Sequence, residues 1–152
     1  MNPTQKFAPA RTKEKKRKTL TPARSLAAHA IEAAIEKKAL DIVVLDMHEV
    51  SGLADYFVIC TGEVDLQVKA IFEAIEDRIK ETCHERPWHH EGTEHRQWVL
   101  IDYVDLVIHI FSPEKRAFYD LERLWGDAPL ERVLEEASSA ADIHMLQESS
   151  TP

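Results

Sequence analysis

Glycine, cysteine and long apolar runs are scarce in this chain, and each scarcity excludes a class of protein. Only 4 glycines occur among 152 residues, and the loop signature GxxxxGK[ST], which cradles phosphates, is absent. The two cysteines, Cys60 in a predicted buried strand and Cys83 ending a predicted helix, indicate reduced thiols rather than a disulfide scaffold. No stretch approaches the ~18 apolar residues of a membrane span, and no apolar secretory signal is visible. We therefore expect a cytoplasmic protein with no membrane partner.

Charge is distributed unevenly along the chain. The net charge is -8, yet before residue 25 eight basic residues accompany a single acid, Glu14. The chain has 19 basic and 27 acidic residues in total, so 11 basic and 26 acidic residues remain from residue 25 onward. The net charge is therefore about +7 for the N-terminal arm and about -15 for the rest of the chain, the body. Residues 1–21 are predicted to be a disordered basic arm that contacts nucleic acid, with solubility and organelle import as alternatives. The candidate phosphate contacts are Lys13, Lys15, Lys16, Arg17 and Lys18.

Hydrophobic periodicity predicts a domain over residues 22–129. Thr21-Pro22 offers a cap and a first-turn proline for a helix that ends near residues 37–38. Residues 42–45 and 56–60 are typical of buried strands. After Gly62 a long helix is predicted, and its inner face carries Val68, Ile71, Phe72, Ile75 and Ile79.

The last third of the chain has the clearest pattern. Residues 98–101 and 106–111 are rich in β-branched and aromatic residues and predict a hairpin, which a short strand or loop at 87–92 precedes. Ser112-Pro113-Glu114 and Gly126 predict the two ends of one helix. On such a helix Phe118, Leu121 and Trp125 share one face.

The predicted order is helix, strand, strand, helix, three strands and helix. It implies an α/β or α+β domain whose mixed sheet of about five strands is flanked by helices. Beyond Pro129, residues 130–152 are predicted to form a short helix and an acidic flexible tail. The apolar residues of this short helix are Leu130, Val133, Leu134 and Ala137.

Several segments, in this order, resemble the Iojap family, called ribosomal silencing factors in bacteria. The matching segments lie within about residues 26–129 and read ADYFVICTG at 54–62, Glu91-Gly92, WVLIDY at 98–103, DLVIHIF at 105–111 and FYDLERLWG at 118–126. The resemblance implies a nucleotidyltransferase-like fold. It also implies binding to the large ribosomal subunit at its ribosomal protein fourteen, a steric block of subunit joining, a role in large-subunit biogenesis and a homodimer off the ribosome.

Six residues are predicted to contact this partner, because they combine aromatic anchors with charge. They are Trp98, Asp102, Tyr103, Tyr119, Glu122 and Arg123. From the residues alone, the favoured role of Trp98 and Tyr119 is to cap the core; the resemblance favours binding instead. In the hairpin turn, Val104 stands where the family often has glycine, so it is strained if the turn needs a positive φ.

The competing hypothesis is a nucleotide-using transferase on the same fold. Such an enzyme needs paired carboxylates that hold magnesium. Asp102 and Asp105 flank the hairpin turn instead, Asp46 has no carboxylate two residues away, and Glu63 places an acid beside Gly62. We therefore expect neither catalysis nor a cofactor.

Histidines near residue 90 suggest a third hypothesis, a metal-sensing regulator. Cys83 and His84, His89, His90 and His95 lie within 13 residues, but their spacing differs from that of structural zinc sites. We expect a solvated loop without a metal. His109, inside a strand, is expected to be a hydrogen-bonded core residue.

Overall fold

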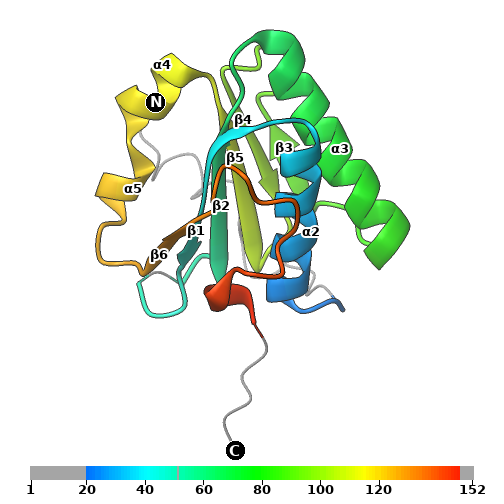
Figure 1. Ribbon diagram of the computed structural model, residues 1–152, viewed down its shortest axis with the longest axis vertical. Coiled ribbons are helices and arrows are strands. Elements are labelled where there is room, and N and C mark those ends of the chain that lie inside the picture. The colour runs from blue at the N-terminus through cyan, green and yellow to red at the C-terminus, as the bar shows by residue number, and fades with distance from the viewer. Residues whose placement is uncertain (1–19, 51, 148–152) are drawn as a thin grey trace, which may run out of the picture.

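The computed structural model describes residues 20–50 and 52–147. Its centre is a six-stranded mixed sheet in the order β3-β4-β5-β2-β1-β6, with helices on both faces (Figure 1). The strands are β1 (Leu40–Asp46), β2 (Tyr56–Thr61), β3 (His89–Glu91), β4 (Trp98–Asp102), β5 (Leu106–Phe111) and β6 (Leu130–Arg132). The helices are α2 (Ala23–Glu36), α3 (Asp65–Cys83), α4 (Pro113–Tyr119), α5 (Leu121–Leu124) and the 3-10 helix η2 (His144–Leu146).

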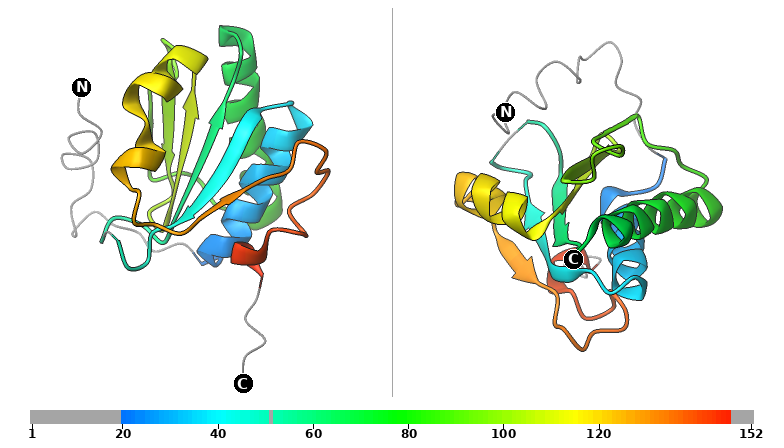
Figure 2. Two further views of the ribbon diagram at one scale, coloured as in Figure 1. Left: turned by 60° about the vertical axis from the view of Figure 1, so that its left-hand side comes forward. Right: turned by 90° about the horizontal axis from the view of Figure 1, so that it is seen from above.

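Strand pairing makes the sheet mixed. β2 and β5 are parallel, whereas the other neighbouring strands are antiparallel. Helices α2 and α3 cover one face and α4 and α5 the other (Figure 2). The predicted mixed α/β class and the β4–β5 hairpin are confirmed, with six strands in place of about five.

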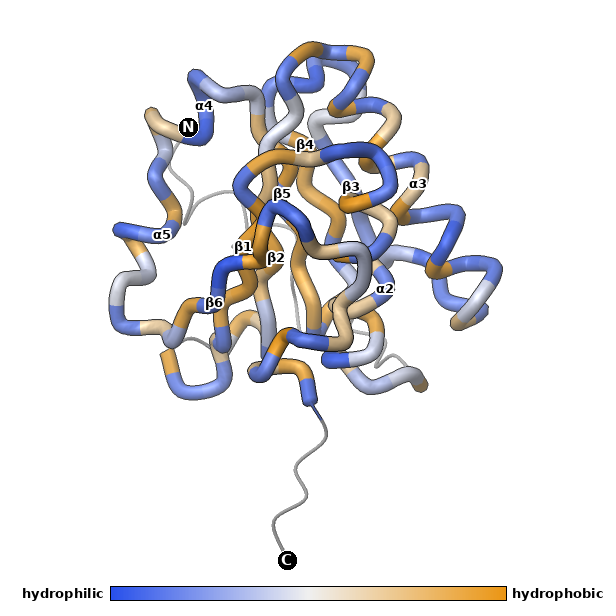
Figure 3. The backbone as a smooth tube through the Cα atoms, in the orientation of Figure 1, coloured by the Kyte–Doolittle hydropathy of each residue, from blue (hydrophilic) through white to orange (hydrophobic). Residues whose placement is uncertain are grey.

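Each central strand supplies two cores, because successive side chains point to opposite faces. In β2, Val58 and Cys60 join the core under α2 and α3, whereas Phe57 and Ile59 join the core on the α4–α5 side. Burial on both faces explains why the central strands are continuous apolar runs (Figure 3).

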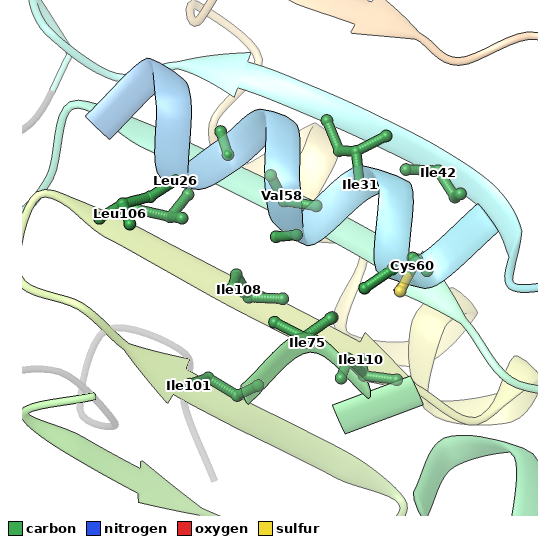
Figure 4. Close-up of a cluster of buried hydrophobic side chains, with 14 of the residues drawn as sticks. Leu26, Ile31, Ile42, Val58, Cys60, Ile75, Ile101, Leu106, Ile108 and Ile110 are labelled. Atoms are coloured by element: carbon green, nitrogen blue, oxygen red, sulfur yellow. The ribbon is translucent and has the colours of Figure 1, made fainter. Parts of the chain in front are cut away.

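Helices α2 and α3 seal the larger core. Figure 4 shows Leu26 and Ile31 of α2 and Ile75 of α3 among the side chains of β2 and β5. The inner face predicted for the long helix is confirmed, since its five apolar residues are all buried. The predicted Thr21 cap is wrong: Pro22 is the N-cap residue of α2, and the Thr21 N–H donates to Glu85 Oε2 at 2.8 Å.

The predicted single helix from Pro113 to Gly126 is also wrong, because the chain turns at Asp120. This residue has φ 45° and ψ 59° and ends α4. Asp is among the few non-glycine residues that enter the left-handed region readily. The turn buries Leu121 completely and leaves Phe118 75% exposed, so the two do not share a face.

The short helix predicted beyond Pro129 is replaced by strand β6. It pairs antiparallel with β1, with Val44 opposite Glu131. Without this partner, β1 would be an edge strand with unpaired backbone groups. The sheet is thus extended by residues whose apolar spacing resembled a helix.

Residues 138–147 form an ordered strap, contrary to the predicted frayed tail. Ala140, Ile143 and Leu146 are buried in the core under α2. Glu32 accepts the N–H of Ala140 at 2.9 Å, and Glu131 accepts the backbone N–H groups of residues 144 and 145. The predicted flexible tail at 148–152 and the basic arm with Lys13, Lys15, Lys16, Arg17 and Lys18 lie outside the described residues.

Removing residues 138–152 is expected to lower the free energy of unfolding by about 3 kcal/mol or more, because two large aliphatic side chains leave the core. Thermal and urea melts would measure the loss. Removing only residues 148–152 is the matched control and should leave both melts unchanged. Identical melts for the longer deletion would contradict the role of Ile143 and Leu146 in the core.

Candidate partner-binding face

An aromatic cluster fills the core on the α4–α5 side of the sheet. The Trp98 ring stacks on Phe111 with centroids 4.9 Å apart, and Tyr119 of α4 lies 4.5 Å from Trp98. Tyr119 is half-buried. The cluster therefore ties α4 to β4 and β5 through ring contacts.

Trp98 is a core residue in this cluster. Only 6% of it is exposed, and its indole Nε1–H donates to His109 Nδ1 at 3.1 Å. Since Nδ1 accepts this bond, it carries no proton. The expectation that His109 is a hydrogen-bonded core residue is confirmed. Trp98, predicted to contact the partner, is buried, in agreement with the alternative that it caps the core.

Arg116 links α4 to three other elements. Its Nη1 donates to Thr61 Oγ1 at 2.9 Å, and its Nη2 donates to the Asp41 carbonyl at 2.8 Å. Its Nε and Nη2 also donate to the Glu122 carboxylate of α5, at 3.0 to 3.3 Å. Glu122, predicted to contact the partner, is therefore engaged within the protein.

The outer surface of α4 and α5 presents large apolar side chains beside positive charge. Phe118 is 75% exposed and Leu124 is 48% exposed. The Lys115 ammonium lies 5.7 Å from the Phe118 ring centroid, a cation–π contact, and Arg123 is exposed. We call this surface, Lys115, Phe118, Tyr119, Arg123 and Leu124, the α4–α5 face.

Asp102 and Tyr103 lie away from this face, in the hairpin turn. Trp98 and Asp102 are the two ends of β4, roughly 13 Å apart at about 3.3 Å per residue. Asp102 is 1% exposed, and Tyr103 is fully buried in the core under α2 and α3. The structure therefore separates them from Tyr119, Glu122 and Arg123.

The hairpin turn is strained, as expected for a β-branched residue at positive φ. Val104 has φ 74°, and the Asp105 N–H donates to the Tyr103 carbonyl at 3.0 Å, which makes a γ-turn. Such a conformation costs of order 1–3 kcal/mol. The Asp102 carboxylate offsets part of this cost, because its Oδ1 accepts the Val104 N–H at 2.7 Å.

Replacing Tyr103 with phenylalanine is expected to leave the protein as stable as before or up to about 1 kcal/mol more stable. The Tyr103 hydroxyl is buried and finds no hydrogen-bond partner among the described residues, so removing it ends a desolvation cost. Burial also raises the pKa of this hydroxyl above its usual value, so it stays protonated at neutral pH. A urea melt that shows a clear loss of stability would contradict this.

At the place where a transferase would bind its nucleotide, the Gly62 backbone N–H is already engaged. In open α/β sheets, ligands bind where parallel strands send their helices to opposite faces, here between β2 and β5. There the Gly62 N–H donates to the Phe111 carbonyl at 2.9 Å. A Cβ on Gly62 would lie 2.7 Å from a Val68 methyl, so this glycine serves the packing of α3.

Other candidate chemical groups also have structural partners. Asp46 Oδ1 lies 2.6 Å from His48 Nδ1, and this hydrogen bond raises the pKa of His48 above its usual value. Burial raises the pKa of the Cys60 thiol to about 12, so it is no nucleophile at neutral pH. These contacts disfavour catalysis.

The histidine-rich segment is paired with acids on the surface. His90 Nδ1 lies 2.7 Å from Glu76 Oε2, and His89 Nε2 lies 3.7 Å from Glu91 Oε1. Across residues 20–50 and 52–147, no three His, Cys, Asp or Glu side chains are grouped so as to hold a metal ion.

In the same part of the chain, no helix is long and apolar enough to cross a bilayer.

Sequence reasoning missed Arg116, which holds the α4–α5 pair in place. On one continuous helix, Arg116 would face Asp120 four residues on. Because the chain turns at Asp120, Arg116 meets Glu122 instead. No pattern in the sequence marks that turn, so only the structure reveals this contact.

Comparison with known proteins agrees with this fold. A family model described as "Ribosomal silencing factor during starvation" matches residues 20–151. The ribosomal silencing factor RsfS of Bacillus subtilis (strain 168) is 46% identical over 101 residues, which are 66% of this chain and 85% of that protein. The mitochondrial assembly of ribosomal large subunit protein 1 of Mus musculus is 32% identical over 92 residues, 59% of this chain and 40% of that protein.

A solved structure has a similar fold. The crystal structure of a Chromobacterium violaceum protein has a TM-score of 0.67 at 34% identity and covers 70% of this chain and 88% of that one. The family model spans most of the chain, including the aromatic cluster and the α4–α5 face. This chain therefore belongs to the ribosomal silencing factor family.

Proposed function

We propose that this protein binds the large ribosomal subunit at its ribosomal protein fourteen and sterically blocks joining of the small subunit. The observation that carries the proposal is the α4–α5 face, where Phe118 is 75% exposed beside Tyr119 in a chain of the silencing family. The name of the mouse relative, which refers to assembly of the large ribosomal subunit, supports that subunit as the partner.

The face has the chemistry of a binding hot spot. Exposed aromatic side chains supply a large contact area, and arginine and aromatic residues are enriched among hot spots. Tyr119 is held by the Trp98 ring and α4 by Arg116, so the face is preorganised. Preorganisation reduces the entropy lost on binding.

Charge suits a ribosomal partner in two ways. The net charge of the body, about -15, attracts a basic ribosomal protein at long range and favours rapid association, while the α4–α5 face itself carries Lys115 and Arg123. The basic arm, residues 1–21, is proposed to contact rRNA phosphates.

Removing residues 1–20 should then make the salt dependence of binding shallower by up to ~0.7 to 0.9 log units per lost contact. Equal slopes for full-length and trimmed protein would assign the arm to solubility.

The proposed action is steric and takes place in the cytoplasm. Bound protein occupies the surface that the small subunit needs, so no bond is made or broken and release restores joining. A role in large-subunit biogenesis would use the same contact. The homodimer off the ribosome stays a prediction.

Co-sedimentation with separated subunits tests the partner. We expect the protein to move with the large subunit through a sucrose gradient and to remain at the top with the small subunit alone. Equal recovery with both subunits would contradict the proposal. The transferase alternative predicts heat on titration with magnesium and nucleotides, whereas the binding proposal predicts none.

A further inference from the structure

Helix α4 has one apolar anchor, Tyr119, whose ring packs against Trp98 and Phe111. None of its seven residues, all of them described, is buried. In α5 only Leu121 is buried. Because isolated helices of this length are unstable in water, other contacts must fix their orientation.

Arg116 provides such contacts at the centre of α4. Its side chain is 12% exposed, and the side chain of Glu122 is 20% exposed. Its guanidinium donates to the end of β2 at Thr61, to β1 at Asp41 and to α5 at Glu122. One planar group therefore fixes α4 against two strands and sets the angle between α4 and α5.

The ion pair between Arg116 and Glu122 spans the turn at Asp120. That residue is the only one between the two helices, and its left-handed backbone sets their relative direction. Arg116 lies before the turn and Glu122 after it, so their ion pair closes the α4–α5 unit. A lysine ammonium keeps the charge but cannot present a planar fork to several acceptors at once.

We infer that Arg116 is the positioning residue of the α4–α5 face. It holds Phe118 and Leu124 in the arrangement that the partner meets, without touching the partner itself. The inference rests on the proposed function and adds to it a residue that sets the shape of the face. Its loss should weaken partner binding far more than it weakens the rest of the fold.

The test compares Arg116→Lys with Arg78→Lys. Arg78 is the matched control, since it forms an ion pair with Glu32 between α2 and α3, on the opposite side of the sheet. We expect Arg116→Lys to lower affinity for the large subunit at least tenfold, and Arg78→Lys to change it less than threefold. Equal losses in both variants, or no loss in Arg116→Lys, would overturn the inference.

Hydrogen exchange of the free protein separates this inference from the proposed function. In Arg116→Lys, and in Glu122→Gln as a milder second variant, amides of residues 113–124 should exchange at least tenfold faster while those of α3 stay unchanged. Unchanged exchange in residues 113–124 would overturn the inference. If wild-type protein fails to bind the large subunit, the proposed function fails, and this exchange measurement still decides the role of Arg116.

Discussion

Replacing Trp98 with alanine is expected to lower the free energy of unfolding by about 3 to 5 kcal/mol, because it removes a large buried ring. The ring lies 4.9 Å from Phe111 and 4.5 Å from Tyr119, and its Nε1–H binds His109. Thermal and urea melts would measure the effect. Partner binding should fail at temperatures where the variant unfolds.

Trp98→Phe is the control that separates the stability contributed by ring packing from the stability contributed by the indole N–H hydrogen bond. The smaller ring keeps contacts with Phe111 and Tyr119 and loses the hydrogen bond to His109, at a cost of about 1 to 2 kcal/mol. A melting temperature that Trp98→Ala leaves unchanged, together with lost partner binding, would contradict the core role. That outcome would instead favour Trp98 as a partner contact, which the family resemblance implies.

Replacing Phe118 with aspartate is expected to weaken large-subunit binding by about 2 kcal/mol or more, roughly thirtyfold. The ring is 75% exposed, so the free energy of unfolding should change by no more than about 0.5 kcal/mol. Affinity titration beside a thermal melt checks both statements.

Leu66→Asp is the matched control for Phe118→Asp. Leu66 is 73% exposed, but it lies on α3, which covers the other face of the sheet. This variant should bind the large subunit like the wild type. If both variants lose affinity equally, added negative charge and not the α4–α5 face would explain the loss.

Period and propensity predicted the central strands and the long helix correctly. Strands β2, β4 and β5 are buried on both faces, so apolar residues, most of them β-branched or aromatic, occupy most of their positions. Helix α3 has one solvated face, so its buried residues repeat at helical spacing. In both cases the local spacing of apolar residues indicates which side chains are buried in the fold.

The described chain beyond β5, residues 112–147, could not be predicted as well, because tertiary contacts decide its structure. β6 needs the edge of β1, and the strap of residues 138–147 needs the carboxylates of Glu32 and Glu131. The turn at Asp120 is fixed by burial of Leu121 and by the Arg116–Glu122 pair. The partners of β6 and of Ala140 lie far away in the sequence, and the Arg116–Glu122 pair forms only because the chain turns at Asp120, so none of these contacts gives a periodic signal.

The site residues could be predicted only in part, because tertiary contacts also decide which of them are buried and which are exposed. Aromatic residues in the motif could be core or interface, and the structure assigns Trp98 to the core and Phe118 to the surface. Tyr103 and Asp102 belong to the same motif block as Trp98, yet the length of β4 places them at the other end of the sheet. Sequence proximity therefore grouped residues that serve different parts of the fold.

Subunit joining is the most direct test of the proposed function. Purified protein would be added to large subunits before small subunits, and the yield of joined ribosomes would be read from a sucrose gradient. We predict that the yield falls in proportion to bound protein with the wild type and Leu66→Asp, and much less with Phe118→Asp. An undiminished yield of joined ribosomes at saturating wild-type protein would contradict the proposal.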